Sequence, residues 1–215
     1  MLKKIIAALG LCWLPLWIGA HGVPAQPIEA GDYAGFLSVG AVHGANKLGG
    51  IKWADGGMAY GAQFFMFPNK YFGLGVEVNL AHFNQANTMQ HFCAGLNCVK
   101  VNYKVRARAN NFMLASRVNI NPDDNVRLYI PFGVGVTKYQ ASMDVENIHQ
   151  HTSGTNLAYY IGGGIEMATE KGILVGIEYR YNGFEAEIDD KRYEYGSRSF
   201  HPHYFTLSMK LGYKF

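Results

Sequence analysis

The chain has 215 residues and a formal net charge of +3, to which Lys3 and Lys4 near the N-terminus contribute. Without the signal peptide that we predict below, roughly 190 residues would remain, which corresponds to one domain, and the remaining charge would be near neutral, which indicates no nucleic-acid partner. Glycine (26), tyrosine (14) and phenylalanine (13) are abundant and proline (7) is scarce, as is typical of a chain rich in strands.

The N-terminal segment has the three parts of a secretory signal peptide. Met1 to Lys4 is short and basic, Ile5 to Ala20 is mainly apolar, and Val23-Pro24-Ala25 fits the small-x-small rule for cleavage. We therefore predict a signal peptide over residues 1–25, with a cut after Ala20 as the second choice.

Two other interpretations of the leader are weaker. An uncleaved membrane helix is disfavoured because Pro15 interrupts a run that is already short for a span. A lipoprotein signal at Cys12 fails because the preceding residue is Leu11, where that signal needs a small side chain. Residues 26–215 are therefore expected to be exported and to form one domain.

Eight segments of the exported part alternate apolar and polar residues, the period of a strand with two unlike faces. The expected strands cover residues 33–43, 57–67, 71–83, 101–120, 126–145, 156–168, 173–188 and a last segment that ends at position 215. The fourth segment changes phase between its halves. A β-bulge is expected near residues 108–111, since one extra residue resets the alternation.

The alternation is strictest in the last eleven residues, Phe205 to Phe215. A wholly apolar strand face that stops on an aromatic residue is typical of the closing strand of an outer-membrane barrel, which faces lipid and ends at the aromatic girdle.

The connections between the expected strands alternate in length. Those at 68–70, 121–125 and 169–172 are short and rich in turn formers, whereas those at 43–56, 84–100, 146–155 and 189–199 are longer and polar. Short turns on the periplasmic side and long loops outside are typical of outer-membrane barrels.

The two faces of the expected strands differ in charge. The apolar rows contain no charged residue, and the opposite rows are rich in glycine and carry seven: Glu77, Arg117, Arg127, Glu166, Glu178, Arg180 and Lys210. A charge at the bilayer midplane costs about 2–4 kcal/mol, so these side chains are expected to face inward. Eight strands leave an interior just wide enough for side chains. We therefore predict a lumen packed by a charge network of Glu77, Arg117, Arg127, Glu166, Glu178 and Arg180.

The sequence thus predicts an all-β fold, an eight-stranded antiparallel up-and-down transmembrane β-barrel over residues 26–215 in the outer membrane. The main alternative is a secreted lipocalin-like barrel, which also has eight strands. That barrel would place apolar residues inside. Here the charged rows are also the glycine-rich rows, which suits a crowded inner wall.

Three segments, residues 72–77, 129–135 and 175–182, resemble strands of the OmpA-like small barrels, of the opacity-protein and neisserial surface protein A type. The resemblance implies an outer-membrane barrel that acts through surface loops, as adhesins or host-contact proteins do, without cofactor or catalytic motif. Its implied partners are outer-membrane lipid and lipopolysaccharide, the barrel-assembly machinery and a host receptor or matrix ligand. The terminal strand, with Tyr213 and Phe215, resembles the signal that the assembly machinery reads.

Cys93 and Cys98 lie four residues apart in the second long connection. In an oxidising compartment a small disulfide staple is favoured, and a metal pair is the alternative.

Six histidines lie in or near the outer loops: His82, His91, His149, His151, His201 and His203. A surface zinc or copper site from His149/His151 and His201/His203 is the alternative to ordinary loop residues, and we assign no metal.

An enzyme interpretation rests on His151-Thr152-Ser153, which has the His-x-Ser spacing of outer-membrane lipid A deacylases, with Glu166 as an orienting acid. A serine nucleophile needs a histidine base within hydrogen-bond reach and a third group to orient it. Ser153 is expected at a loop tip, however, and Glu166 belongs to the inward row. We therefore expect no enzyme. A lipid-modifying enzyme and a purely envelope-supporting barrel remain the alternatives.

Overall fold

The computed structural model describes residues 27–44, 47–48, 51–52, 56–84, 86–94, 97–145, 148–188 and 198–215. The predicted signal peptide and its cleavage site lie outside these residues. In the described part of the chain, no helix is long and apolar enough to span a membrane.

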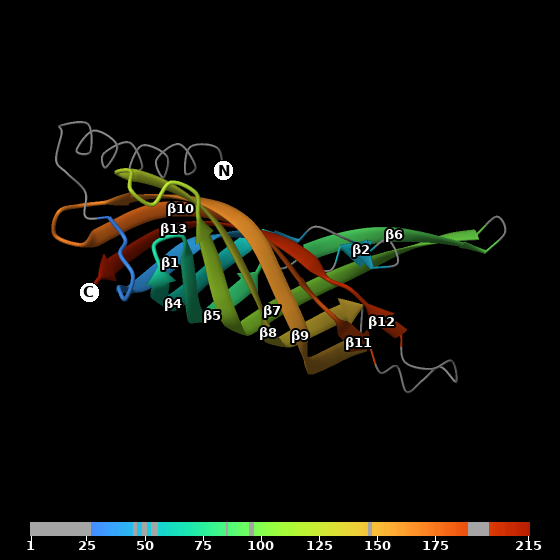
Figure 1. Cartoon of the computed structure of the whole chain (residues 1–215). Helices are drawn as coiled ribbons and strands as arrows, with labels where there is room; N and C mark the ends of the chain where they lie inside the picture. Colours follow the sequence, from blue (N-terminus) through green and yellow to red (C-terminus); the bar gives the residue numbers. More distant parts are fainter. Residues whose placement is uncertain are drawn as a thin grey trace, which may run out of the picture.

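Within the described ranges, eight strands close into an antiparallel barrel (Figure 1), which confirms the predicted fold class. The wall strands are β1 (Tyr33–Gly44), β4 (Gly57–Asn69), β5 (Phe72–Phe83), β7 (Asn97–Asn119), β8 (Val126–Val145), β9 (Ile148–Ala168), β10 (Ile173–Phe184) and β13 (His203–Lys214). Each wall strand pairs with the next along the chain, and β1 pairs with β13 to complete the ring.

The two ends of the barrel differ. At one end, called the lower end below, the wall strands are joined by turns at residues 70–71, 120–125 and 169–172. At the other, upper end the described residues form four hairpins: β2 (Lys47–Leu48) with β3 (Ile51–Lys52), β6 (Ala86–Ala94) with the start of β7, β8 with β9, and β11 (Ala186–Ile188) with β12 (Arg198–Phe200). Figure 1 shows β6 and the upper part of β7 reaching well beyond the barrel wall.

Two of the expected long loops are largely strand. Residues 86–94 pair with 97–105, and β8 pairs with β9 as far as Val145 and Ile148. The prediction that 84–100 and 146–155 are connections outside the strands is therefore wrong for most of these residues. The two strands of a hairpin satisfy each other's backbone hydrogen bonds. Their pairing can therefore continue above the top of the closed barrel wall.

The predicted bulge is also wrong. β7 pairs with β5 and with β8 in continuous register through residues 108–111. Val105 and Ala107 are buried in the same inward row as Asn111 and Arg117. The apparent change of phase arises because the lumen is apolar in its upper part, so inward residues there look like lipid-facing ones. The described register shift lies instead at the end of β4, between Met66 and Asn69.

The lower end is closed by the segment that precedes β1. Ile28 is buried, and Lys214 Nζ donates hydrogen bonds to the Pro27 carbonyl oxygen (2.7 Å) and to Asp32 Oδ2 (3.0 Å). Two neighbouring turns are joined by Lys70 and Asp123, 2.6 Å apart, and this hydrogen bond raises the pKa of Lys70.

Candidate functional site

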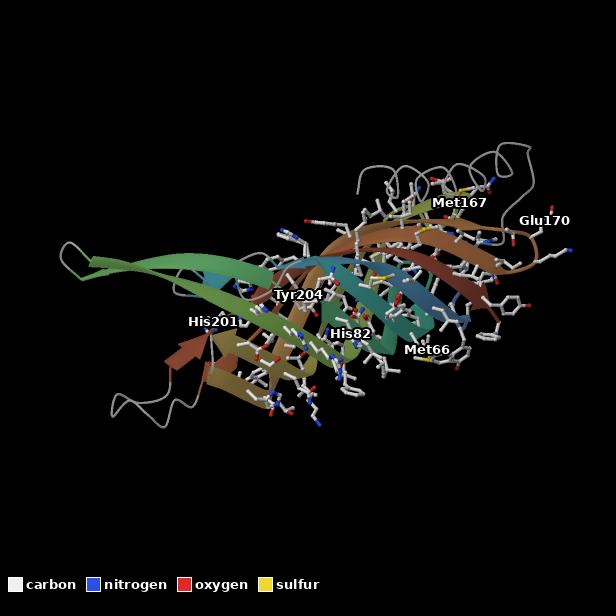
Figure 2. The ribbon with its side chains drawn as sticks, turned by 180° about the vertical axis from the view of Figure 1, so that it is seen from behind. Met66, His82, Met167, Glu170, His201 and Tyr204 are labelled. Atoms are coloured by element: carbon white, nitrogen blue, oxygen red, sulfur yellow. The ribbon has the colours of Figure 1, made fainter. Side chains whose placement is uncertain are left out.

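The outer wall of the barrel is covered by exposed apolar side chains. Leu37, Leu114, Val134 and Leu211 are each more than half exposed, and at the lower edge the rings of Tyr213 and Phe215 contact each other at 5.3 Å. Figure 2 shows side chains projecting around the wall, with Met66, Met167 and Glu170 towards the lower end and His201 towards the upper. An apolar surface that surrounds the whole wall requires lipid as its solvent.

The lower lumen holds an ion cluster around Glu166, which reaches in from β9. Arg117 donates two hydrogen bonds to the Glu166 carboxylate, at 2.9 and 3.3 Å, and its Nε donates to Asn119 Oδ1 at 2.8 Å. Arg127 lies 3.9 Å from the same carboxylate, and the Arg117 guanidinium stacks on the Tyr129 ring at 3.9 Å. All of these side chains are almost fully buried.

A second ion cluster crosses the lumen at mid-height. Glu178 of β10 accepts a hydrogen bond from Lys210 Nζ (3.1 Å) and pairs with Arg180, which also pairs with Glu77 on β5. Gln63 completes the chain, since its Nε2 donates to Glu77 Oε2 at 2.8 Å. Six strands contribute charged side chains to the two clusters, so the ion pairs tie opposite sides of the wall together.

Above the ion clusters the lumen becomes polar and then apolar. Asn111 hydrogen-bonds Thr137, and its Nδ2 donates to the Tyr204 hydroxyl at 2.6 Å. The Tyr204 ring packs against Phe83 at 5.4 Å, and above them Tyr139 packs against Phe184 at 5.7 Å. Described side chains therefore occupy the lumen from its lower end to its upper mouth.

Several predicted site residues lie on the upper hairpins. In the β6–β7 ladder Cys93 lies directly opposite Cys98. Directly opposed residues of antiparallel strands have Cα atoms about 4.5–5.5 Å apart, within the range that a disulfide spans. The side chains of both cysteines lie outside the described part, so the disulfide stays a prediction.

The deacylase-like residues are not brought together. His151 and Ser153 both face outward from β9, whereas Glu166 lies in the lumen on Arg117. Ser153 is also not at a loop tip, because residues 148–168 form one continuous strand. The side chains of His91 and His149 lie outside the described part, and the residues that the structure describes contain no cluster of three or more metal-ligating side chains.

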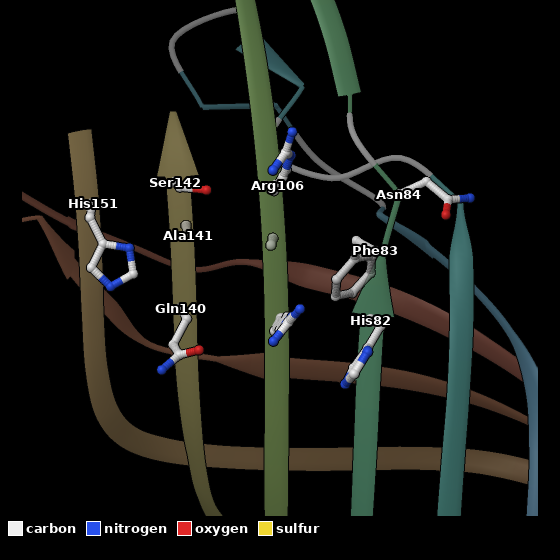
Figure 3. A pocket seen from close by; sticks show the side chains of 10 residues that line it. His82, Phe83, Asn84, Arg106, Gln140, Ala141, Ser142 and His151 are labelled. Carbon is white, nitrogen blue, oxygen red and sulfur yellow. The ribbon is translucent and has the colours of Figure 1, made fainter. Parts of the chain in front are cut away.

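The sequence analysis missed one feature of the outer face. A groove of about 520 Å³ lies on the wall across β5, β7, β8 and β9, above the apolar surface (Figure 3). Its outward-facing side chains include His82, Arg106, Arg108, Gln140 and His151. The signal was the alternation of Lys104, Arg106 and Arg108, which has the phase of the outward row. The bulge that we predicted wrongly assigned these three residues to the inward face.

The comparisons with known proteins agree with this architecture. Residues 16–215 match the model of a family described as the outer membrane protein beta-barrel domain. A comparison with characterised protein sequences finds no match.

Three solved structures illustrate the likeness. Ail, the attachment invasion locus protein of Yersinia pestis, is 18% identical with a TM-score of 0.49, over 86% of this chain and 99% of that chain. OprG of Pseudomonas aeruginosa is 16% identical with a TM-score of 0.49, over 89% and 99%. A major outer membrane protein of Thermus thermophilus is 11% identical with a TM-score of 0.50, over 84% and 99%. At these identities the likeness extends to the fold alone.

Proposed function

The chain belongs to the outer membrane protein β-barrel family, and from this premise we propose that it is a closed, non-enzymatic barrel that acts at the cell surface through its upper hairpins. Adhesion or host contact is the activity that this arrangement supports best. The observation that carries the proposal is the contrast between a lumen filled with paired side chains and hairpins that extend far above the wall.

The filled lumen argues against passage of solutes. The Arg117–Glu166 pair and the pairs of Glu178 with Lys210 and Arg180 are buried, and each would have to separate before a channel could open. Removing one partner of such a pair leaves an uncompensated buried charge. The barrel is therefore expected to be a rigid support.

The upper hairpins supply a preorganised surface. β6 and the upper part of β7 form a ladder of nine residue pairs, and β8 and β9 stay paired as far as Val145 and Ile148. A paired ladder loses less conformational entropy on contact than an irregular loop, and a Cys93–Cys98 disulfide would reduce that loss further.

The proposed orientation places the hairpins outside and the short turns in the periplasm. β13 closes the ring against β1, and Tyr213 near its end and Phe215 directly after it are both exposed on the outer face. This end is the proposed assembly signal for the barrel-assembly machinery. Epitope tags in 84–100 and in 189–199 should label on intact cells, while a tag in the turn at 169–172 should label only after permeabilisation.

The activity is tested by replacing residues 86–105 with a two-residue turn and measuring attachment of intact cells to host cells or matrix. Attachment should be lost while the barrel still assembles, because the wall below this hairpin is unchanged. The control is a substitution of the same kind in the turn at 169–172, which should leave attachment intact. Unchanged attachment after replacement of both the 86–105 and the 189–199 segments would contradict the proposal.

The non-enzymatic part of the proposal has its own test. Ser153→Ala should leave the mass of the cell's lipid A unchanged, because the structure keeps Glu166 away from His151. A change in lipid A mass would place the chain among lipid-modifying enzymes instead.

A further inference from the structure

The outward face of the wall changes character at one level on β5, β7, β8 and β9. Below that level the outward residues are apolar and include Leu80, Phe112, Val136 and Leu157, all exposed. Above it every described outward side chain on these four strands is polar or charged. This level marks the upper edge of the hydrocarbon-facing band.

The groove described above begins at this edge. Strand register places His82, Arg108, Gln140 and Ser153 side by side in one row. The next row up contains Arg106, Ser142 and His151. Figure 3 shows His82, Arg106, Gln140, Ser142 and His151 among the residues that line one pocket, and their alternation along the strands places these side chains on the outward face.

The charge at this site is one-sided. Among the described outward side chains of the four strands, four are cationic and one, Asp144, is acidic. The four cations are Lys104, Arg106, Arg108 and Lys138, all exposed and all on β7 or β8.

Among the described residues, the outward face of β10 and β13, farther round the barrel, carries no lysine or arginine. Aromatic side chains lie on this face instead: Tyr179 stacks on Phe205 with ring centroids 5.6 Å apart, and the tilted Tyr181 ring lies 5.4 Å from the Phe205 ring. Basic side chains that serve only to place their charge in water are expected at this level all around the wall, and that role does not explain why they are confined to two strands. The segregation indicates a localised anionic ligand.

The place of the groove defines the chemistry of that ligand. It adjoins the apolar band without interruption, so an amphiphile can lie with its acyl chains along Leu80, Phe112 and Val136 and its headgroup in the groove. Guanidinium groups bind phosphate through two parallel hydrogen bonds, and basic pockets at the membrane surface bind anionic headgroups. A freely diffusing anion would gain nothing from the apolar surface below.

We propose that the groove lined by His82, Arg106, Arg108, Gln140, Ser142 and His151 binds a phosphate group of lipopolysaccharide in the outer leaflet. This inference rests on the proposed orientation, which puts the groove at the outer surface. It gives the barrel a preferred lipid neighbour on its β7–β8 side, and it fixes the rotation of the barrel relative to that lipid.

The test measures binding of diphosphorylated lipid A to the full mature chain in detergent micelles by native mass spectrometry and by titration. Arg106→Gln/Arg108→Gln should weaken binding by roughly 30-fold, because each basic residue near a membrane surface contributes to headgroup affinity. The matched control, Lys70→Gln/Lys171→Gln, removes two charges at the opposite end and should leave the affinity unchanged.

A second arm needs no variant. Wild-type protein should bind dephosphorylated lipid A far more weakly than the diphosphorylated form, and inorganic phosphate at the same concentration should not displace the lipid. Equal binding of both lipid forms, equal weakening by the control variant, or displacement by free phosphate would each overturn the proposal. The epitope-tag experiment reports the orientation independently of these results.

Discussion

The ion cluster around Glu166 offers the most direct test of how this barrel is held together. Glu166 is 1% exposed and is the counterion of two guanidinium groups, those of Arg117 and Arg127. Glutamine has nearly the same size and keeps a hydrogen-bond acceptor, but it carries no charge. Glu166→Gln therefore leaves the shape of the lumen intact and removes the shared counterion of two buried cations.

The expected cost is large. Breaking a buried ion pair by removal of one partner destabilises proteins by about 3–5 kcal/mol. Here the lost contacts are hydrogen bonds at 2.9 and 3.3 Å and an ion pair at 3.9 Å, all out of contact with solvent. The lower end of that range already corresponds to a change of more than about a hundredfold in the ratio of folded to unfolded protein.

The assay is reversible urea unfolding of the barrel in lipid vesicles, followed by far-ultraviolet circular dichroism. Glu170→Gln is the matched control, because it makes the same substitution four positions away in an exposed turn, where a charge contributes little to stability. Arg117→Met/Glu166→Gln should recover part of the loss, since one of the two uncompensated cations is then absent. A Glu166→Gln barrel that unfolds at the same urea concentration as the control would refute the counterion role.

Three further results are expected. Gly164→Ala should destabilise the barrel by about 1–3 kcal/mol, because its Cβ would overlap the buried Tyr129 ring, whereas Gly163→Ala should be tolerated since nothing lies within 4 Å of the new methyl group; equal unfolding free energies would contradict this. Planar-bilayer recordings of the native protein should show little or no steady conductance, and large porin-like currents would rule out the filled lumen. Mass spectrometry of unreduced protein should find Cys93 and Cys98 resistant to alkylation until a reductant is added, and alkylation without reductant would exclude the disulfide.

The alternation of residues was enough to predict the closed barrel, for a physical reason. Hydrocarbon excludes charge from the outward row, and an eight-stranded lumen admits only side chains, so the inward row carries both the charges and the glycines that make room for them. The contacts within that row are a different matter. Glu77 and Arg180 are 103 positions apart and meet across the lumen from β5 and β10. Which cation reaches which carboxylate depends on strand tilt and side-chain conformation, and a one-dimensional pattern contains neither.

The groove escaped prediction because period-2 alternation identifies two faces without saying which face is outside. In the lower part of β7 the ambiguity is resolved by Arg117, which lipid would not accept. In the upper part Val105 and Ala107 face inward and Arg106 and Arg108 face outward, so the same criterion gives the opposite answer. The criterion fails there because this part of the strand lies above the hydrocarbon. At that level an outward-facing charge contacts water and headgroups and carries no desolvation cost.

The level at which the criterion fails is therefore informative in itself. Continuous pairing of β7 with β8 fixes the phase of the strand, so the outward arginines are evidence that the wall has passed from lipid tails to headgroups. A barrel whose lumen is filled has no interior surface left for a ligand. The surfaces left for a ligand are the outward rows above this level and the hairpins that continue them. At those positions the hydrocarbon does not restrict the polarity of the side chains.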